Sequence, residues 1–362
     1  MRILVDCHAF DGGGQGVVSH IWGLYGALTR LQPQTEFFFA AHDVNNLKKF
    51  FDRSPNVRFV KYVSKNKYIR LLFEITWLQL KWKIDVLHCQ YYLPLLRASR
   101  EIVTIHDVLF LDHTELFPLG YRLKNGLLFA MATARADLVL TVSAYSKSRM
   151  QKHFGWLRRQ VVVVPNGVME FPKEQEPPKI CLRQAKYILY VSRIEKRKNH
   201  VNLCRAFIQA RLSDEYGLVL VGKDDVGSDE FHAFFRNLSE KHRRRVEILQ
   251  SVSYFELADL YKKCSLFVFP SLCEGFGMPP LEAVLLGASV ICAKNTAMSE
   301  FSFFEDRFFD ATSVSEMSTK IEMYVDNRVN TESMKQAVVG KYSWDRIAQN
   351  YSTVLAERFI EV

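Results

Sequence analysis

The chain alternates between short apolar runs and longer helix-like stretches, and the alternation occurs twice. This pattern is typical of a parallel sheet with helices on both faces. The predicted strands are 2–8, 36–42, 57–63, 85–89, 101–107, 138–143 and 161–167 in the first half, and 187–192, 218–222, 246–252, 266–271 and 288–294 in the second. We therefore expect an α/β protein with two doubly wound, Rossmann-like domains.

The segment EFPKEQEPPK, at 170–179, separates the two halves. Its prolines cannot continue a helix or a central strand, so it predicts a domain junction. The expected domains are 1–170 and 171–345, and a C-terminal helix in 346–362 is expected to pack back towards the first domain. Because such sheets bind ligands at the carboxyl ends of their strands, we expect both domains to face a shared cleft.

Composition excludes several classes of protein. The 362 residues are 48% apolar and 24% charged, which is enough for two hydrophobic cores. No apolar run reaches the roughly 18 residues of a membrane span, and the N-terminus lacks the apolar core of a signal peptide, so a cytoplasmic location is expected. The seven cysteines contain no C-x-x-C pair and no D-x-D sequence occurs, so neither a disulfide framework nor a metal site is predicted.

Positive charge is concentrated between Lys48 and Lys83, where ten Lys or Arg residues oppose two acids and are interleaved with aromatic residues. Such a segment favours contact with an anionic membrane surface or with nucleic acid. The alternative is a solvated basic face whose aromatic residues lie in the core. We keep the membrane as the expected partner of 48–83 and expect no nucleic acid.

The segment PSLCEGFGMPPLEAVLLG, at 270–287, begins at the end of the predicted strand 266–271. Pro280 suits the first turn of a helix, and the preceding GFG leaves the backbone free to expose its N–H groups. Exposed amides at a helix start attract phosphate, whereas carboxylates beside them accept hydrogen bonds from hydroxyl groups. Glu274 and Glu282 therefore suit the two hydroxylated rings of a nucleoside diphosphate sugar. The alternative for either one is an acid favoured by the helix dipole.

Cations for a diphosphate occur in VSRIEKRKNH, at 191–200, after the first strand of the second half. Arg193 and Lys198 could neutralise the diphosphate and stabilise it as it leaves, which a metal ion does in other sites. The alternative is a pair of ordinary solvated charges.

In the first half, DGGGQG at 11–16 opens a helix-like run. As a dinucleotide fingerprint it fails at its third glycine, where Val17 stands, although Asp43 could imitate the acid that binds ribose. His106 and Asp107 end one predicted strand, and His88 ends another. We expect His106 in the site, whereas a lone histidine such as His88 is more often a structural residue.

Together these segments resemble the retaining glycosyltransferases of family 4, which have the GT-B fold of two facing Rossmann-like domains. The matching segments occur in order along most of the chain: GGGQG, TIHD, LTVSAYSK, VVPNGV, VSRIEKRKN, LVG and PSLCEGFGMPPLEA. The last contains the family's two glutamates separated by seven residues. One departure is Ser192, because the family commonly has glycine before the arginine of the phosphate motif.

The resemblance implies a role for each matching residue. Glu274 would bind hydroxyls of the transferred sugar, and Glu282 would bind the ribose. Arg193 and Lys198 would stabilise the leaving diphosphate, and His106 would touch the transferred sugar near its reacting carbon. The other predicted donor-binding residues are Gly13, Gly14, Asp107, Gly222, Lys223, Val252, Gly275, Phe276, Gly277, Met278 and Leu281.

The leading hypothesis is a retaining hexosyltransferase that uses no metal and acts on a saccharide or lipid-linked saccharide in surface polysaccharide synthesis. The stretch TIHDVLFLDHTELFP resembles that of bacterial mannosyltransferases, which favours GDP-mannose as the donor over UDP-glucose and UDP-N-acetylglucosamine. One alternative is an NAD-dependent oxidoreductase that uses DGGGQG, and another is a carbohydrate-binding subunit without activity. A nucleotide-sugar 2-epimerase would need acid and base carboxylates placed differently.

Overall fold

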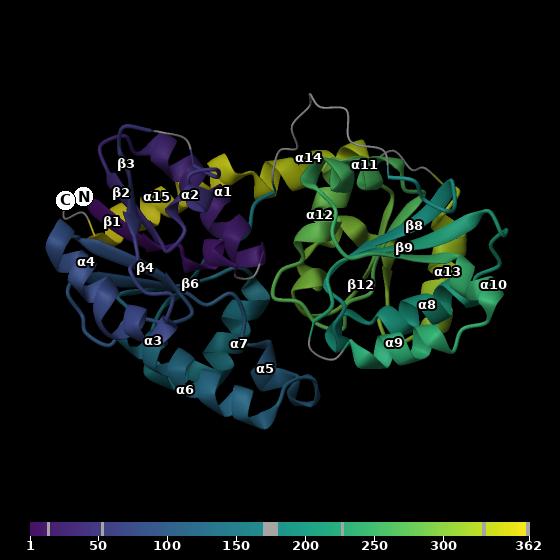
Figure 1. Ribbon diagram of the computed structural model, residues 1–362, viewed down its shortest axis with the longest axis horizontal. Coiled ribbons are helices and arrows are strands. Elements are labelled where there is room, and N and C mark those ends of the chain that lie inside the picture. The colour runs from purple at the N-terminus through teal and green to yellow at the C-terminus, as the bar shows by residue number, and fades with distance from the viewer. Residues whose placement is uncertain (13–14, 52–53, 169–179, 226–227, 328–330, 360–362) are drawn as a thin grey trace. The chain divides into compact units, whose positions relative to one another are not determined.

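The computed structural model describes residues 1–12, 15–51, 54–168, 180–225, 228–327 and 331–359 (Figure 1). The chain divides into two compact units. Unit 1 comprises Met1–Gly167 and Tyr342–Val362, and unit 2 comprises Val168–Lys341. The predicted junction within 170–179 lies outside the described residues, so the predicted domain bounds stay a prediction.

Unit 1 contains a parallel sheet of seven strands in the order β3-β2-β1-β4-β5-β6-β7. Its central strand β1 pairs with β2 and β4, so that Ile3 lies opposite Phe37 and Val86. The strands are β1 (Arg2–Asp6), β2 (Glu36–Ala41), β3 (Val57–Lys61), β4 (Val86–Gln90), β5 (Arg100–Thr104), β6 (Leu138–Thr141) and β7 (Val161–Val163). Phe37, Phe38 and Phe39 are all buried. Because successive side chains point to opposite faces of a sheet, both faces must be covered.

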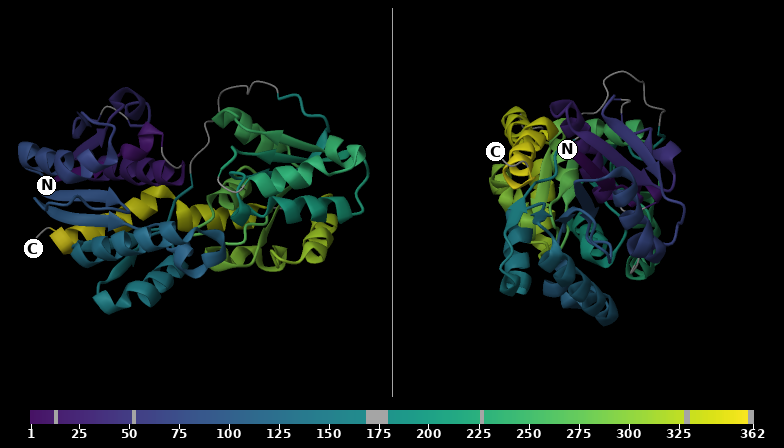
Figure 2. Two further views of the ribbon diagram at one scale, coloured as in Figure 1. Left: turned by 60° about the horizontal axis from the view of Figure 1, so that its bottom comes forward. Right: turned by 90° about the vertical axis from the view of Figure 1, so that its left-hand side faces the viewer.

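Helices cover both faces of this sheet (Figures 1 and 2). They are α1 (Gln15–Leu31), α2 (Val44–Leu47), α3 (Lys67–Ile69), α4 (Ile75–Trp82), α5 (Leu109–Asp112), α6 (Leu119–Arg135), α7 (Ala144–Phe154) and α15 (Trp344–Phe359). Polar caps fix several of their starts. The Ser143 side chain, for example, accepts a hydrogen bond from the Ser146 amide at 2.9 Å where α7 begins.

Unit 2 contains a parallel sheet of six strands in the order β10-β9-β8-β11-β12-β13. The strands are β8 (Lys186–Val191), β9 (Tyr216–Val221), β10 (Val246–Leu249), β11 (Leu266–Phe269), β12 (Val290–Ala293) and β13 (Phe308–Phe309). Its α-helices are α8 (His200–Gln209), α9 (Asp229–Arg236), α10 (Glu240–Arg244), α11 (Tyr254–Lys263), α12 (Met278–Leu285), α13 (Val314–Tyr324) and α14 (Glu332–Tyr342), of which the last ends in unit 1.

The predicted α/β class with two doubly wound parallel sheets is confirmed. Each of the predicted strands occurs in the structure, and the sequence missed only β13 among the strands of the described residues. That strand has two residues, which are too few to show a period. Among the described residues, no helix combines the length and the apolar character that crossing a bilayer requires.

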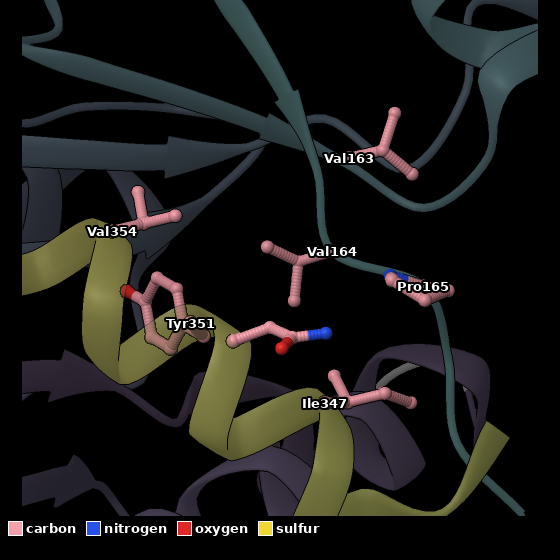
Figure 3. A pocket seen from close by; sticks show the side chains of 7 residues that line it. Val163, Val164, Pro165, Ile347, Tyr351 and Val354 are labelled. Atoms are coloured by element: carbon pink, nitrogen blue, oxygen red, sulfur yellow. The ribbon is translucent and has the colours of Figure 1, made fainter. Parts of the chain in front are cut away.

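The C-terminal helix α15 packs against α1 in unit 1 (Figure 1). The Trp344 indole fills the space beside two glycines: a Cβ atom on Gly23 would lie 1.9 Å from its ring, and one on Gly167 would lie 2.5 Å away. A cavity of about 50 Å³ remains between α15 and the end of β7, lined by Val163, Val164, Pro165, Ile347, Asn350, Tyr351 and Val354 (Figure 3). It is far smaller than the roughly 300 Å³ of a small-molecule site, so it is a packing gap.

Replacing Gly23 by alanine should destabilise unit 1, because the added methyl group collides with the Trp344 ring. We expect Gly23→Ala to lower the free energy of unfolding by about 1–3 kcal/mol, as overpacking typically does. Gly26→Ala on the same helix is the matched control, since its Cβ would meet its nearest atom at 3.9 Å. Urea unfolding followed by circular dichroism measures both, and equal effects would contradict this account of how α15 is held.

Candidate functional site

The strand order of unit 2 reverses between the neighbouring strands β8 and β11. In doubly wound sheets, ligands bind beyond the carboxyl ends of the strands at such a reversal. Residues 192–199 follow β8, and residues 270–277 follow β11. The structure thus brings together the two segments that carry the predicted cations and the first predicted glutamate.

Glu274 lies at the centre of a buried ion cluster. Its Oε1 accepts a hydrogen bond from Lys198 Nζ at 2.5 Å, and its Oε2 accepts one from Arg197 Nη1 at 3.2 Å. Glu274 is only 8% exposed and Lys198 only 9%. Arg197 also pairs with Glu195 at 2.8 Å. The sequence predicted Lys198 but missed Arg197, because a run of neighbouring cations does not tell which of them turns towards the acid.

The charges of this cluster depend on one another. Burial by itself would raise the pKa of Glu274, but Lys198 and Arg197 outweigh it and lower the pKa to about 2. Burial also lowers the pKa of Lys198, whereas Glu274 opposes that shift. Glu274 is therefore ionised at neutral pH and has only hydrogen-bond acceptors to offer, which suits it to hydroxyl donors.

Hydrogen bonds fix the loop that carries Glu274. Asn199 has a φ of 63°, a left-handed conformation that asparagine tolerates, and its Nδ2 donates to the carbonyls of Pro270 and Ala311 at 3.0 and 2.8 Å. The Leu272 amide donates to the Arg197 carbonyl at 2.8 Å. The Glu274 amide donates to Thr296 Oγ1 at 2.9 Å. The loops after three strands, β8, β11 and β12, thus hold this carboxylate in place.

The predicted helix start also occurs. Gly277 has a φ of 110° and directly precedes α12, whose first turn contains Pro279 and Pro280. A Cβ atom on Gly277 would lie 2.3 Å from Met298 Sδ, so this position requires glycine. Of the other residues predicted here, Gly275, Phe276 and Leu281 are buried and Met278 is half-buried.

Glu282 has an environment opposite to that of Glu274. It lies on α12, and its Oε2 accepts a hydrogen bond from Tyr261 Oη on α11 at 3.1 Å. Burial raises the pKa of Glu282 to about 7, and the Tyr261 hydrogen bond opposes this rise only in part. Sequence reasoning missed Tyr261, which lies 21 residues away.

The remaining predicted residues of unit 2 follow neighbouring strands at the same edge. Gly222 follows β9, and a Cβ atom there would lie 1.9 Å from the Ser192 carbonyl oxygen. Lys223 is exposed, and Val252 follows β10 and is half-buried. Arg193 is 55% exposed and forms an ion pair with Asp225.

Ser192, where the family commonly has glycine, does not disturb the backbone after β8. The Ser192 amide donates to the Val221 carbonyl at 2.9 Å, which extends the pairing of β8 with β9. The strand pairing at this position therefore does not require the glycine that the family commonly has.

In unit 1, His106 lies just beyond the end of β5 and packs edge-to-face against His20 of α1, with ring centroids 4.9 Å apart. His106 Nε2 lies 2.9 Å from Gln90 Oε1, and His20 Nδ1 lies 2.8 Å from Asn166 Oδ1. Burial lowers the pKa of both rings, that of His20 to about 4, so both are neutral at pH 7. Buried His20 Nε2 and Gln90 Nε2 have no hydrogen-bond partner among the described residues.

The other first-half candidates have structural partners or lie outside the described residues. His88 is fully buried, with Tyr25 Oη 2.5 Å from its Nδ1 and Thr104 Oγ1 2.8 Å from its Nε2, as expected of a structural histidine. Asp107 accepts a hydrogen bond from the Leu109 amide at 3.2 Å. Asp43 caps α2. Gly13 and Gly14 lie outside the described residues, so their predicted role stays a prediction.

Within the described part of the chain, no group of three or more His, Cys, Asp or Glu side chains is arranged to hold a metal ion. Independence of a metal stays a prediction.

Removing the main partner of Glu274 should be costly. Lys198→Ala leaves the buried carboxylate with one cation, Arg197, and a hydrogen bond from Ser271, and we expect it to lower the free energy of unfolding by about 3–5 kcal/mol at pH 7. The matched control is Lys186→Ala, which breaks an exposed pair with Glu215 and should cost less than about 1 kcal/mol.

The cost of Lys198→Ala should also depend on pH. The lowered pKa of wild-type Glu274 contributes stability above pH 4.5, and this is lost as the pH falls towards 2. In the variant the pKa of Glu274 rises, so the carboxyl takes up a proton and the difference between variant and wild type narrows on acidification. Urea unfolding at pH 7 and pH 4 measures this, and a cost that does not change with pH would contradict it.

Glu282 should give the opposite pH dependence. Because its folded-state pKa is raised to about 7, the stability it contributes is fully present below pH 4.5 and is lost as the pH rises through 7. Glu282→Gln stays neutral, so at pH 8 we expect the variant to be more stable than wild type by on the order of 3 kcal/mol, because the pKa of Glu282 rises from 4.5 to about 7. At pH 5 the difference should be much smaller. Unfolding curves that differ equally at both pH values would refute this assignment.

Comparison with known families matches almost the whole chain. The model described as "Glycosyl transferases group 1" matches residues 173–340, and the model described as "Glycosyltransferase Family 4" matches residues 14–169.

Several curated relatives are named as mannosyltransferases. The serotype-specific mannosyltransferase WbdA of Escherichia coli is 32% identical over 170 residues, which is 45% of this chain and 20% of the relative. The O-antigen chain mannosyltransferase B of Escherichia coli is 30% identical over 230 residues, which is 58% of this chain and 57% of the relative. The chain thus matches a fifth of the first relative and somewhat over half of the second.

Solved structures share the fold. Sucrose-phosphate synthase from Thermosynechococcus elongatus is similar with a TM-score of 0.76 at 17% identity, over 99% of this chain and 98% of that one. At this identity the likeness shows the fold alone. The ordered motifs, the two sheets and the two matching family models lead to one conclusion: the chain belongs to the glycosyltransferases of family 4 and has the GT-B fold.

Proposed function

We propose that the chain transfers a hexose from a nucleotide diphosphate sugar to a saccharide or lipid-linked saccharide in surface polysaccharide synthesis, with retention of configuration and without a metal. The observation that carries this proposal is the buried Glu274 carboxylate, which Lys198 and Arg197 keep ionised where doubly wound sheets bind ligands. A fixed, ionised carboxylate in a dry environment accepts strong hydrogen bonds from sugar hydroxyls.

Cations and backbone amides would bind the diphosphate of the donor. In the proposed complex, Arg193 and Lys198 exchange part of their contact with Asp225 and Glu274 for diphosphate oxygens. The amides of 275–278, at the start of α12, would face the distal phosphate. Negative charge that develops on the leaving group is then stabilised by groups that are already in position.

The neutral His106 would act through a hydrogen bond. Burial lowers its pKa, and Gln90 orients its ring, so the imidazole does not add a positive charge to the site. The acceptor oxygen would form its bond to the anomeric carbon on the face from which the diphosphate departs. The bond between the anomeric carbon and the diphosphate oxygen would break, and the diphosphate would leave with its electron pair and take up the acceptor's proton. No enzyme nucleophile is then needed, and configuration is retained.

The names of the relatives support mannose as the transferred sugar. Both relatives described above are named as mannosyltransferases, which favours GDP-mannose over UDP-glucose and UDP-N-acetylglucosamine as the donor. Glu282 would bind the ribose in any of these donors, so the choice of sugar does not depend on it.

Turnover should require Glu274 and Arg193. With GDP-mannose and a mannose-terminated acceptor, we expect Glu274→Gln and Arg193→Ala each to lower turnover about 100-fold or more, since each removes a fixed contact to the reacting donor. Released GDP measures turnover, and Lys186→Ala is the control for an exposed cation of the same unit.

Two further measurements test the proposed mechanism. Turnover should persist in EDTA if no metal is needed. Nuclear magnetic resonance of the product should show an α-linkage if configuration is retained.

Two outcomes would overturn the proposal. Unchanged turnover in both site variants would remove Glu274 and Arg193 from the reaction. Tight binding of NAD together with no release of nucleotide from any of the three donors would favour the oxidoreductase alternative. Thermal melting of each variant must show a folded protein, and a misfolded Glu274→Gln would leave Arg193→Ala to decide the matter.

A further inference from the structure

Residues 67–82 of unit 1 form one continuous helical segment, made of α3, the π-helical turn Arg70–Glu74 and α4. One side packs into the core through Ile75 and Leu78. The other side exposes apolar residues three or four positions apart, which places them on one stripe of the helix. They are Ile69, Phe73, Trp77 and Leu80, with Tyr68 and Leu72 beside them.

Helix α6 carries a second exposed stripe. Its inner side packs into the core through Phe129 and Ala132. Its outer side exposes Leu119, Leu123, Leu127 and Met131, four positions apart, with Tyr121 beside them. Leu123 is 67% exposed. A helix on a water-facing surface has a polar outer side, so α6 departs from the usual pattern.

The two helical segments that carry these stripes are neighbours. The Tyr92 ring lies 4.3 Å from Lys67 Nζ, and Tyr92 Oη donates to Asn125 Oδ1 at 2.6 Å, which links α3 to α6 (Figure 1). The exposed Leu95 and Leu96 continue the surface between the helices. The Leu95 amide donates to the Leu71 carbonyl at 2.9 Å, and Arg135 of α6 donates to the Leu95 carbonyl at 2.9 Å. We call this surface, formed by residues 67–82, 95–96 and α6, the two-helix face.

The two-helix face has more cations than acids. Helix α6 contains Arg122 and Lys124 and no acid, and its Arg135 pairs with the buried Glu101 of β5. Residues 67–82 contain a single acid, Glu74, which accepts hydrogen bonds from the Val63 and Ser64 amides. Burial, Lys124 and Arg70 together lower the pKa of Lys67, so these cations lie close enough to repel one another. The surface is therefore both apolar and positively charged.

We propose that the two-helix face binds the surface of an anionic lipid bilayer. Leucine and aromatic side chains gain by entering the boundary of the bilayer, while Lys and Arg beside them attract anionic headgroups. Lys81 Nζ lies 4.6 Å from the Trp77 ring, a pairing suited to that boundary. Protein interfaces are depleted in lysine, which favours a lipid partner over a protein. This inference does not rest on the proposed transfer reaction.

The structure narrows the surface predicted from the sequence. In the first half of the basic segment 48–83, Phe51 and Tyr62 are buried and residues 57–61 form strand β3. Among the described residues of 48–83, only 67–82 present their aromatic side chains together on one exposed stripe. Helix α6, which the prediction did not include, supplies the other half of the surface.

Sedimentation with vesicles tests the proposal without donor or acceptor. We expect the wild-type protein to bind vesicles that contain phosphatidylglycerol at least about tenfold more tightly than vesicles of phosphatidylcholine alone, and less tightly as salt is added. Leu123→Glu combined with Leu127→Glu should weaken this binding at least about tenfold. Lys67→Gln combined with Lys124→Gln should weaken it several-fold while leaving the apolar stripes intact.

The matched control is Met323→Glu on α13, which places a glutamate at a position of unit 2 that is 50% exposed. It should bind the vesicles like wild type. Because Leu123, Leu127 and Met323 are exposed, the glutamate variants should leave thermal melting unchanged. The proposal is overturned if wild type shows no preference for phosphatidylglycerol, or if the double glutamate variant binds as wild type does. It is also overturned if wild type is a dimer without affinity for lipid and the same variant is a monomer, because a second copy would then cover this face.

Discussion

A carboxylate that is removed from water must either keep a cation beside it or take up a proton, and Glu274 meets the first condition. Its partners Lys198 and Arg197 come from the loop after β8, whereas Glu274 itself follows β11. These loops can meet only because β8 and β11 are neighbours at the point where the strand order reverses. The strand order of the sheet therefore places the two loops side by side. The cations of one loop then keep Glu274 of the other ionised, as the proposed chemistry requires.

The two glutamates of one short motif differ in charge because their neighbours differ. Glu274 faces two cations and stays ionised, whereas Glu282 is desolvated beside Tyr261, which raises its pKa to about 7. A spacing of seven residues contains no information about this difference, which arises from elements packed against the motif. In the proposed donor complex, Glu274 is limited to accepting hydrogen bonds, while Glu282 can also donate one when it is protonated.

Local features of the sequence were sufficient to predict the fold and the edge of the sheet where the candidate site lies. Buried runs such as Phe37–Phe39 indicate a strand by themselves, and the motifs stand directly after such runs. The partners of the predicted residues could not be predicted in this way. Arg197 is one of several cations in a row, and His20 meets Asn166 across 146 residues of sequence. Strand β13 is too short to show a pattern.

Helix α6 is a second case in which the sequence pattern alone does not predict the packing. Leucines four positions apart normally indicate the side of a helix that faces the core, but in α6 the core side is instead formed by Asn125, Phe129, Ala132 and Thr133. The exposed leucines are left over after the core is complete. The inner side of α6 is packed against the core, but its outer side leaves apolar side chains in contact with water. Such a surface favours a partner that is itself apolar. The cations of α6 and of residues 67–82 favour a partner that carries negative charge. Anionic lipid is both apolar and negatively charged.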